Sequence, residues 1–200
     1  GAFKVAVGET VFEGRQLIIA TGSEAVVPPI PGVQEGLGDG TVLTNREILS
    51  LTEIPKTLAV IGGGVIGLEM ASYYQTAGSQ VTVIEMLDHI AGNADRELAA
   101  ILQKNFEKKG ITFNLNAQVT AVGNGQVTFK TGDQIQSVAA EKTLLSVGRR
   151  PVTSGIGLES IGVYLERGRI VADEQGRTNV PGGYAIGDAN GDWMLANAAY

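Results

Sequence analysis

Apolar residues lie in short runs, and two of these runs bracket a stretch with helical spacing. The run TLAVI at residues 57–61 predicts a buried strand, and QVTVIE at 80–85 predicts a second one. Between them, residues 64–76 have the spacing of an amphipathic helix, and Gly78 follows as a stop signal. The pattern therefore predicts a β-α-β unit with a right-handed parallel crossover.

Upstream of this unit the pattern favours extended structure. Residues 3–7 and 10–14 flank a Gly-Glu turn, which is typical of a hairpin. The stretch RQLIIATGS, residues 15–23, predicts a buried strand that runs into a Thr-Gly-Ser corner. The proline-rich VVPPIPGV at 26–33 favours an extended crossover between two domains.

Two further helices and several short strands are expected. Thr44 and Glu47 fit a capping box that opens a short helix. Residues 95–110 predict a longer helix, which ends at a glycine and carries an apolar face. Short strands separated by a Gly-Asn-Gly turn at 123–125 follow, and then two more strands. The apolar face of the longer helix consists of Leu98, Ile101, Leu102 and Phe106.

The composition narrows the classes of function. The chain is 44% hydrophobic and 18% charged, so a packed core is expected and disorder is not. Its net charge of −6 argues against binding to nucleic acid or to an anionic membrane. It has no cysteine and a single histidine, His89, which excludes disulfides, thiol nucleophiles and multi-histidine metal sites within this chain. With no secretory signal and no long apolar run, a cytoplasmic protein is expected.

A glycine cluster closes the first strand of the β-α-β unit. Gly62, Gly64 and Gly67 form the pattern G-x-G-x-x-G, which follows a strand and opens a helix. Glu85 ends the second strand, near the spacing of about 20 residues that the dinucleotide-binding fingerprint requires. Together these features predict a dinucleotide site, whereas the alternative is a tight turn that binds no ligand.

The residues of this glycine corner have different physical tasks. Gly62 allows the tight turn, Gly64 lets a pyrophosphate approach the backbone, and Gly67 lets the helix pack against the sheet. The helix start supplies free N–H groups and a partial positive charge for the phosphate, while Gly63 adds flexibility. The candidate nucleotide-binding residues here are Gly62, Gly63, Gly64, Val65, Ile66 and Gly67.

Glu85 bears on the choice of nucleotide. Its carboxylate can accept hydrogen bonds from the ribose hydroxyls of the adenosine half, and it would repel a 2′-phosphate. The sequence after it offers no arginine until Arg96. NAD(H) is therefore favoured over NADP(H). FAD would also fit the glycine fingerprint, so the motif indicates a dinucleotide without fixing the chemistry.

Several motifs, in order, resemble the flavoprotein disulfide reductases, and most closely the dihydrolipoyl dehydrogenase subfamily. The resemblance covers nearly the whole chain. It rests on LIIATGS, PPIPGV, VIGGGVIGLEMA, VTVIE, LLSVGRRP, and GGYAIGDAN followed by MLAN. One departure is Leu195-Ala196-Asn197, where many relatives have Leu-Ala-His.

The resemblance implies an α/β fold made of three pieces. Residues 1–26 would end a first FAD-domain segment, 27–150 would form a Rossmann-like NAD(P)-binding domain with a β-meander, and 151–200 would return to the FAD domain. The redox cysteines, the first FAD glycine box and the acid-base histidine would lie outside this chain. This chain is then expected to be a fragment that is not catalytically competent alone.

The resemblance also implies an activity for the parent protein. The parent would oxidise dihydrolipoamide with NAD⁺ through FAD and a redox disulfide, as a homodimer and as part of a 2-oxo acid dehydrogenase complex. Other members of the superfamily remain open: an NADH oxidase, a transhydrogenase, and a mercuric or glutathione-type reductase. A non-catalytic dinucleotide-binding module is the alternative from a different class.

The resemblance carries over flavin-side roles to matching residues. Thr21 and Gly22 match a corner beside the FAD, and Gly187-Asp188 matches the segment whose aspartate binds the FAD ribitol. Glu69 matches a helix glutamate that pairs with a lysine near the flavin. The alternatives are a helix-capping aspartate and an ordinary exposed helix charge.

The resemblance carries over nicotinamide-side roles as well. Gly148-Arg149 resembles a loop on the NAD side, and Val119 lies where the family packs a residue on adenine. A solvated arginine and a core valine are the alternatives. No catalytic residue and no metal ligand are expected within this chain.

Overall fold

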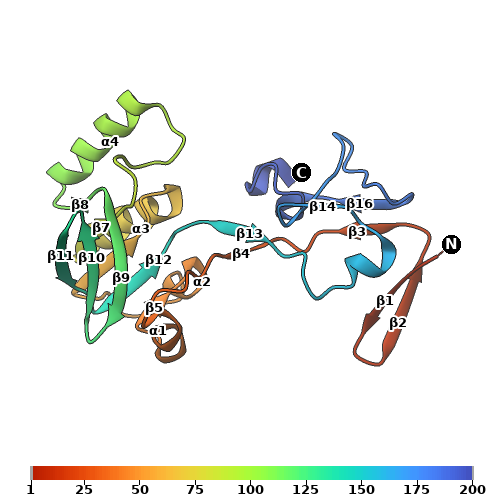
Figure 1. Ribbon diagram of the computed structural model, residues 1–200, viewed down its shortest axis with the longest axis horizontal. Helices are drawn as coiled ribbons and strands as arrows, with labels where there is room; N and C mark the ends of the chain where they lie inside the picture. The colour runs from red at the N-terminus through yellow and green to blue at the C-terminus, as the bar shows by residue number, and fades with distance from the viewer. Residues whose placement is uncertain (1, 200) are drawn as a thin grey trace. The chain divides into compact units, whose positions relative to one another are not determined.

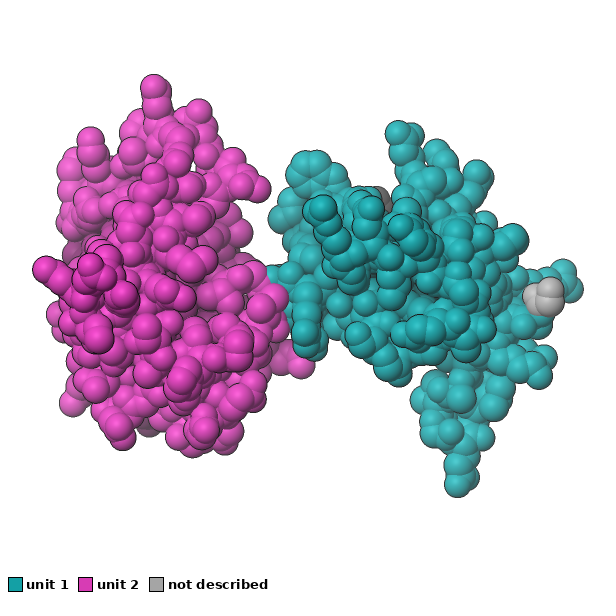
Figure 2. All heavy atoms as spheres, in the orientation of Figure 1, with its two compact units in different colours: residues 1–24, 149–200 teal, residues 25–148 magenta. Residues whose placement is uncertain are grey.

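The structure, a computed structural model, describes residues 2–199, with the backbone alone from residue 198 onward. The chain divides into two compact units (Figures 1 and 2). One unit consists of residues 25–148, and the other combines residues 1–24 with 149–200. In the described part of the chain, every helix is too short or too polar to cross a membrane.

The larger unit is built on a five-stranded sheet in which every pair of neighbouring strands is parallel. Strand β6 lies at its centre, and its alternate residues face opposite sides. Ala59 and Ile61 enter one core cluster, while Leu58 and Val60 enter another. In spatial order the strands are β5 (Val42–Leu43), β12 (Lys142–Leu145), β6 (Thr57–Ile61), β7 (Gln80–Ile84) and β8 (Thr112–Asn114).

A three-stranded antiparallel meander covers one face of this sheet (Figure 1). Val127 and Phe129 of the meander share a core cluster with Ala59 and Ile61 of β6. The Asn124-Gly125 turn has φ values of 52° and 70°, as the type I′ turn of a two-residue hairpin requires. The strands are β9 (Ala117–Gly123), β10 (Gln126–Thr131) and β11 (Gln134–Ala139).

Helices cover the other face. Ala71 and Tyr74 of α3 pack with Leu58 and Val60, and the Tyr74 hydroxyl donates to the Ile48 carbonyl oxygen at 2.7 Å. The predicted capping box is present, because Thr44 and Glu47 bond reciprocally. These helices are α2 (Asn45–Ile48), α3 (Val65–Thr76) and α4 (Arg96–Lys108). A further helix, α1 (Val33–Asp39), was not predicted and packs on the meander side of the sheet, where Val33 and Leu37 join the cluster of Phe129.

Only Phe106 of the predicted apolar face of α4 packs against the rest of the unit. Leu98, Ile101 and Leu102 are 65%, 57% and 37% exposed. Instead Ala99 is buried and Phe106 is partly buried, in a cluster that includes residues of α3 and of the loop before α4. Helical spacing identified a stripe of apolar residues, but the contacts available to the helix lie along the neighbouring stripe.

The smaller unit contains short strands around its own core. Ile19, Ile170 and Ala185 are buried together there, although they come from distant parts of the sequence. Antiparallel pairs form between β1 and β2 and between β14 and β15, β3 and β16 pair in parallel, and β4 pairs with β13. The bounds are β1 (Phe3–Val7), β2 (Thr10–Gly14), β3 (Leu17–Ile19), β4 (Ser23–Ala25), β13 (Arg149–Pro151), β14 (Leu165–Glu166), β15 (Arg169–Ile170) and β16 (Gly183–Ala185), with 3-10 turns at Leu158–Ile161, Gly187–Ala189 and Ala196–Ala199.

This architecture confirms the predicted fold class. The chain is α/β, and the β-α-β unit, the parallel sheet and the meander are all present. The strand at 57–61 and the helix that follows it lie within one residue of their predicted bounds. The spacing of apolar residues, together with the glycines that follow the strand and the helix, was enough to locate the unit that carries the candidate site.

The meander depends on a single large side chain at its centre. Phe129 is 1% exposed, and replacing it with alanine is expected to lower the free energy of unfolding by about 3–5 kcal/mol. Urea denaturation followed by circular dichroism measures the loss. The control is Phe12→Ala, since Phe12 is 58% exposed and its loss should be within about 0.5 kcal/mol. Equal losses in the two variants would contradict this account of the core.

Candidate functional site

Three strand ends meet at the glycine corner. The Gly62 amide donates to the Ile84 carbonyl oxygen of β7 at 2.9 Å, and the Ser146 amide donates to the Ile61 carbonyl oxygen of β6 at 2.8 Å. Strands β7 and β12 flank β6 on opposite sides, so the strand order reverses here. The carboxyl ends of parallel strands at such a reversal are where open α/β sheets bind ligands.

Two of the fingerprint glycines are required by the fold itself. Gly62 has a φ of 103°, and a Cβ on it would overlap the Ser146 carbonyl oxygen. A Cβ on Gly67 would overlap the Gly62 carbonyl oxygen and would lie 3.1 Å from Val60 Cγ1. These two glycines let α3 begin directly against the end of β6, with or without a ligand.

Gly64, in contrast to Gly62 and Gly67, is not required by the packing of the fold. Its φ of −74° is open to any residue, and a Cβ built on it would meet no heavy atom within 4 Å. It is the N-cap of α3, and no side chain caps the helix start. The first N–H groups of a helix have no intrahelical partner, and no side chain takes that place here. The local packing therefore gives no reason for glycine at this position.

Gly63 connects the corner to Glu85. Its amide donates to Glu85 Oε2 at 2.6 Å, and the Leu87 amide donates to Glu85 Oε1 at 2.7 Å. A Cβ on Gly63 would touch the Glu85 side chain at 3.3–3.4 Å, so this glycine does more than add flexibility. Each carboxylate oxygen keeps a further lone pair, because an ionised carboxylate has about four acceptor sites. The carboxylate is thus fixed at the corner and can still accept from a ribose hydroxyl.

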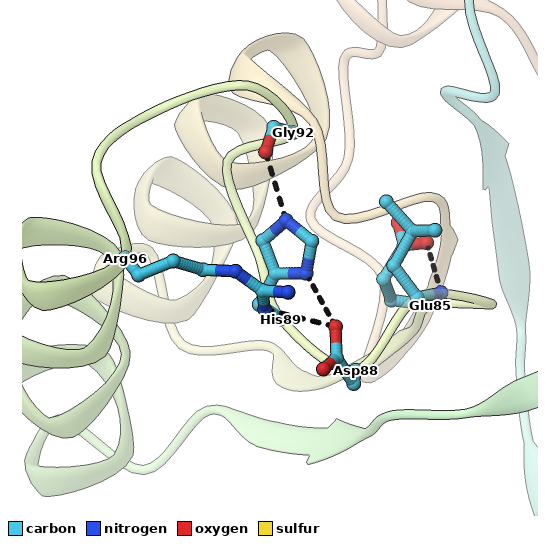
Figure 3. Close-up of polar contacts among 6 residues, drawn as sticks. Glu85, Asp88, His89, Gly92 and Arg96 are labelled. Carbon is cyan, nitrogen blue, oxygen red and sulfur yellow. Dashed lines mark hydrogen bonds and ion pairs between the residues drawn. The ribbon is translucent and has the colours of Figure 1, made fainter.

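The loop after Glu85 carries a second polar cluster (Figure 3). Asp88 Oδ1 accepts from the Arg96 guanidinium at 2.9 Å and contacts His89 Nδ1 at 2.7 Å. His89 Nε2 lies 2.9 Å from the Gly92 carbonyl oxygen. Hydrogen bonds from Arg96 first, and then from His89, lower the pKa of Asp88 to about 2. Asp88 is therefore ionised across the physiological range. The side chain of His89 is 19% exposed.

The candidate flavin residues gather in the smaller unit. The Ser23 hydroxyl donates to Asp188 Oδ2, and Arg149 Nε donates to Ser23 Oγ at 2.7 Å. A second Arg149 nitrogen donates to the Ser23 carbonyl oxygen at 2.7 Å. The exposed Thr21 donates through its hydroxyl to the Val152 carbonyl oxygen at 2.6 Å. Segments more than a hundred residues apart in sequence therefore meet around Asp188.

Gly22 and Gly187 shape the backbone on either side of this network. Their φ values are 72° and 62°, so both lie in the left-handed region that favours glycine. The Gly22 carbonyl oxygen accepts from the Val152 amide at 2.9 Å. The two glycines thus turn the chain next to Ser23 and Asp188 without side chains of their own.

The remaining candidates have less specific surroundings. Glu69 is exposed on α3. Val119 is partly buried on β9 and packs against the core cluster of the meander. Gly148 has a φ of 123°, and its carbonyl oxygen accepts from the Val26 amide at 3.0 Å. Gly148 belongs to the larger unit and Arg149 to the smaller one.

Sequence reasoning did not identify several residues that complete these sites. Ser146 shapes the glycine corner, Ser23 links Arg149 to Asp188, and Asp88 holds Arg96. None carries a local sequence signal, because each acts on a residue from another segment or turn. In the described residues, no group of three or more acidic or histidine side chains is arranged to hold a metal ion.

Comparison with known proteins identifies relatives along the whole chain. Residues 2–200 match the family described as pyridine nucleotide-disulphide oxidoreductase. The chain is 41% identical over 198 residues to a dihydrolipoyl dehydrogenase of Acholeplasma laidlawii, covering 99% of this chain and 58% of that protein. It is 42% identical over 206 residues to a dihydrolipoamide dehydrogenase of Chaetomium thermophilum, covering 96% of this chain and 39% of that one.

The fold of the chain also matches that of a solved flavoprotein disulfide reductase. The HOCl-induced flavoprotein disulfide reductase RclA from Escherichia coli superposes with a TM-score of 0.88 at 28% identity, covering 99% of this chain and 45% of that chain. The chain thus spans between about two fifths and three fifths of the length of these proteins.

The glycine corner predicts that alanine is tolerated at Gly64 but not at Gly67. Gly67→Ala is expected to lower the free energy of unfolding by about 1–3 kcal/mol, because its Cβ would overlap backbone. Gly64→Ala should change it by less than about 1 kcal/mol, because its Cβ enters open space. Chemical denaturation of both variants measures the difference. If Gly64→Ala were as destabilised as Gly67→Ala, the fold rather than a ligand would account for both glycines.

Proposed function

The chain belongs to the pyridine nucleotide-disulphide oxidoreductase family, and from that premise we propose that it is the NAD(H)-binding part of a dihydrolipoyl dehydrogenase. The parent enzyme would oxidise dihydrolipoamide with NAD⁺. The observation that carries the nucleotide assignment is the open Cβ position of Gly64 at an uncapped helix start, beside an oriented Glu85. Relatives at 41% and 42% identity, named as dihydrolipoyl or dihydrolipoamide dehydrogenases, support the substrate.

The residues present fit a dinucleotide at the glycine corner. Residues 62–67 would bind the pyrophosphate through the backbone amides at the start of α3, where the helix dipole is positive. Glu85 would accept from the hydroxyls of the adenosine ribose with the lone pairs that its two amide donors leave free. Val119 would pack against adenine. The role of this chain would be to bind and orient the nicotinamide, which when bound supplies the hydride chemistry.

The residues of the smaller unit fit part of an FAD site. Asp188 is held by Ser23, which is itself held by Arg149, so its carboxylate has a fixed orientation. A carboxylate oxygen of fixed orientation suits the hydroxyls of a ribitol chain, and the glycines at 22 and 187 would leave room beside it. We assign residues 1–26 and 151–200 to FAD-domain segments and 27–150 to the NAD-binding domain; the compact unit at 25–148 supports this division.

Other parts of the proposal concern the whole enzyme. The dithiol step needs a redox cysteine pair and an acid-base histidine that this chain does not supply. Glu69 would pair with a lysine near the flavin, and Gly148 with Arg149 would form part of a loop on the NAD side. The parent would be a homodimer that serves a 2-oxo acid dehydrogenase complex in the cytoplasm.

A second candidate is another flavoprotein disulfide reductase of the same family. The likeness to RclA, with a TM-score of 0.88, favours keeping it, as does Asn197 in place of the usual histidine. The identity of 28% to RclA, against 41% to the Acholeplasma laidlawii enzyme, favours the dehydrogenase.

The nucleotide assignment predicts a defined binding pattern. Calorimetric titration should show that the protein binds NADH more tightly than NADPH. Gly64→Val should weaken NADH binding at least about tenfold, because a side chain would fill the space required by the pyrophosphate. Gly38→Val is the matched control, since its Cβ also enters open space but lies in α1. Equal NADH affinities for the two variants would contradict the pyrophosphate site.

The same titration tests Glu85. Glu85→Gln keeps one acceptor oxygen but removes the charge, so the preference for NADH over NADPH should fall about tenfold. Circular dichroism checks that the corner still folds, because two backbone amides depend on this side chain. An unchanged ratio of the two dissociation constants would contradict the assignment of Glu85 to the ribose site. If the unmodified protein did not bind NADH, the whole proposal would be overturned.

A further inference from the structure

The residues after Glu85 form an ion-pair cluster that the proposed nucleotide site does not use. In Figure 3 the Arg96 side chain, from the first turn of α4, and the His89 ring both point to Asp88. Asp88 Oδ1 accepts from Arg96 at 2.9 Å and contacts His89 Nδ1 at 2.7 Å. A single carboxylate oxygen therefore holds the guanidinium of the first arginine that follows Glu85 in the sequence.

The cluster is fixed next to the glycine corner. The Ala91 amide donates to the Gly63 carbonyl oxygen at 2.8 Å, which ties the loop to the turn that would bind the pyrophosphate. Ile90 is 1% exposed and packs with Leu68 of α3 and Ala99 of α4. Asp88 follows Glu85 by three residues, so at most about 11 Å of extended chain separates them. The loop thus keeps Asp88 and its partners close to the proposed ribose-binding carboxylate.

NAD and NADP differ at the 2′ position of the adenosine ribose, so the partner of Arg96 bears on the choice between them. In sites of this kind a carboxylate accepts from the ribose 2′-hydroxyl of NAD, whereas a nearby arginine accommodates the 2′-phosphate of NADP. Here the carboxylate is present at Glu85. An arginine is also present at Arg96, but its guanidinium is engaged by Asp88.

We propose that Asp88 is a specificity-determining residue that keeps Arg96 from pairing with a 2′-phosphate. Asp88 adds to the effect of Glu85 by occupying the guanidinium. This inference rests on the proposed function, because it needs a nucleotide at the glycine corner.

The expected effect is modest, and the exposure of the pair sets its size. The side chains of Arg96 and Asp88 are 62% and 58% exposed, and ion pairs at such sites are weak. Opening the pair should therefore change NADPH affinity by about two- to fivefold rather than abolish the preference for NADH. The same exposure means that substitutions here leave the core intact.

Four variants of the protein test this role by titration with NADH and with NADPH. Asp88→Asn should tighten NADPH binding about two- to fivefold, while NADH binding stays within about twofold. Arg96→Gln should leave the ratio of the two dissociation constants unchanged, because Arg96 is already engaged. The double variant Asp88→Asn/Arg96→Gln should lose the gain. Glu97→Gln, which removes a charge from the same helical turn, is the matched control and should not reproduce the gain.

The outcomes separate this inference from the proposed function. If NADH binds but Asp88→Asn leaves the ratio unchanged, the inference fails and the nucleotide site stands. A gain that persists in the double variant, or that Glu97→Gln matches, would also overturn it, because loss of negative charge would then suffice. An equal loss of affinity for both nucleotides in Asp88→Asn would show a structural role for the loop. If neither nucleotide binds the unmodified protein, the proposed function fails and this inference fails with it.

Discussion

The glycine corner depends on how closely the start of α3 approaches the end of β6. At Gly62 the space that a side chain would occupy is filled by the Ser146 carbonyl oxygen, and at Gly67 it is filled by the carbonyl oxygen of Gly62. The helix can therefore begin within a few residues of the strand, with the strand ends of β7 and β12 on either side. This proximity places the helix N-terminus at the edge of the sheet, where parallel α/β folds bind their ligands.

The same proximity fixes Glu85 before any nucleotide is bound. The Gly63 amide is available to the carboxylate because the turn leaves it without a partner in the sheet, and the bond at 2.6 Å joins residues 22 apart in sequence. A side chain on Gly63 would press on Glu85, so the middle glycine of the cluster also serves the acidic residue. A carboxylate held in this way loses little conformational freedom when it accepts a ribose hydroxyl, which is the advantage of preorganisation.

The sequence allowed prediction of the features whose signals are local. The β-α-β unit follows from apolar runs and glycine stops, and the capping box of Thr44 and Glu47 follows from residues three apart. The buried face of α4 could not be predicted, because spacing identifies an apolar stripe but not which partners the helix meets. The link from Arg149 through Ser23 to Asp188 joins segments 126 and 165 residues apart, so it appears only after folding. The pairing of Asp88 with Arg96 was not predicted for a related reason, since it depends on the course of a loop.

The charge of the chain shows how an anionic ligand would be held. With 15 basic and 21 acidic residues, the field of the whole protein repels a dinucleotide rather than attracting it. A dinucleotide at the glycine corner would therefore be bound by short-range groups: backbone amides at the start of α3, the dipole of that helix, and hydrogen bonds to Glu85. Such groups act over a single turn, so they can place a pyrophosphate against the backbone while nearby carboxylates discriminate against an additional phosphate. The acidic composition is thus compatible with the proposed nucleotide site, because the attraction would be confined to the helix start and the repulsion would act at the 2′ position.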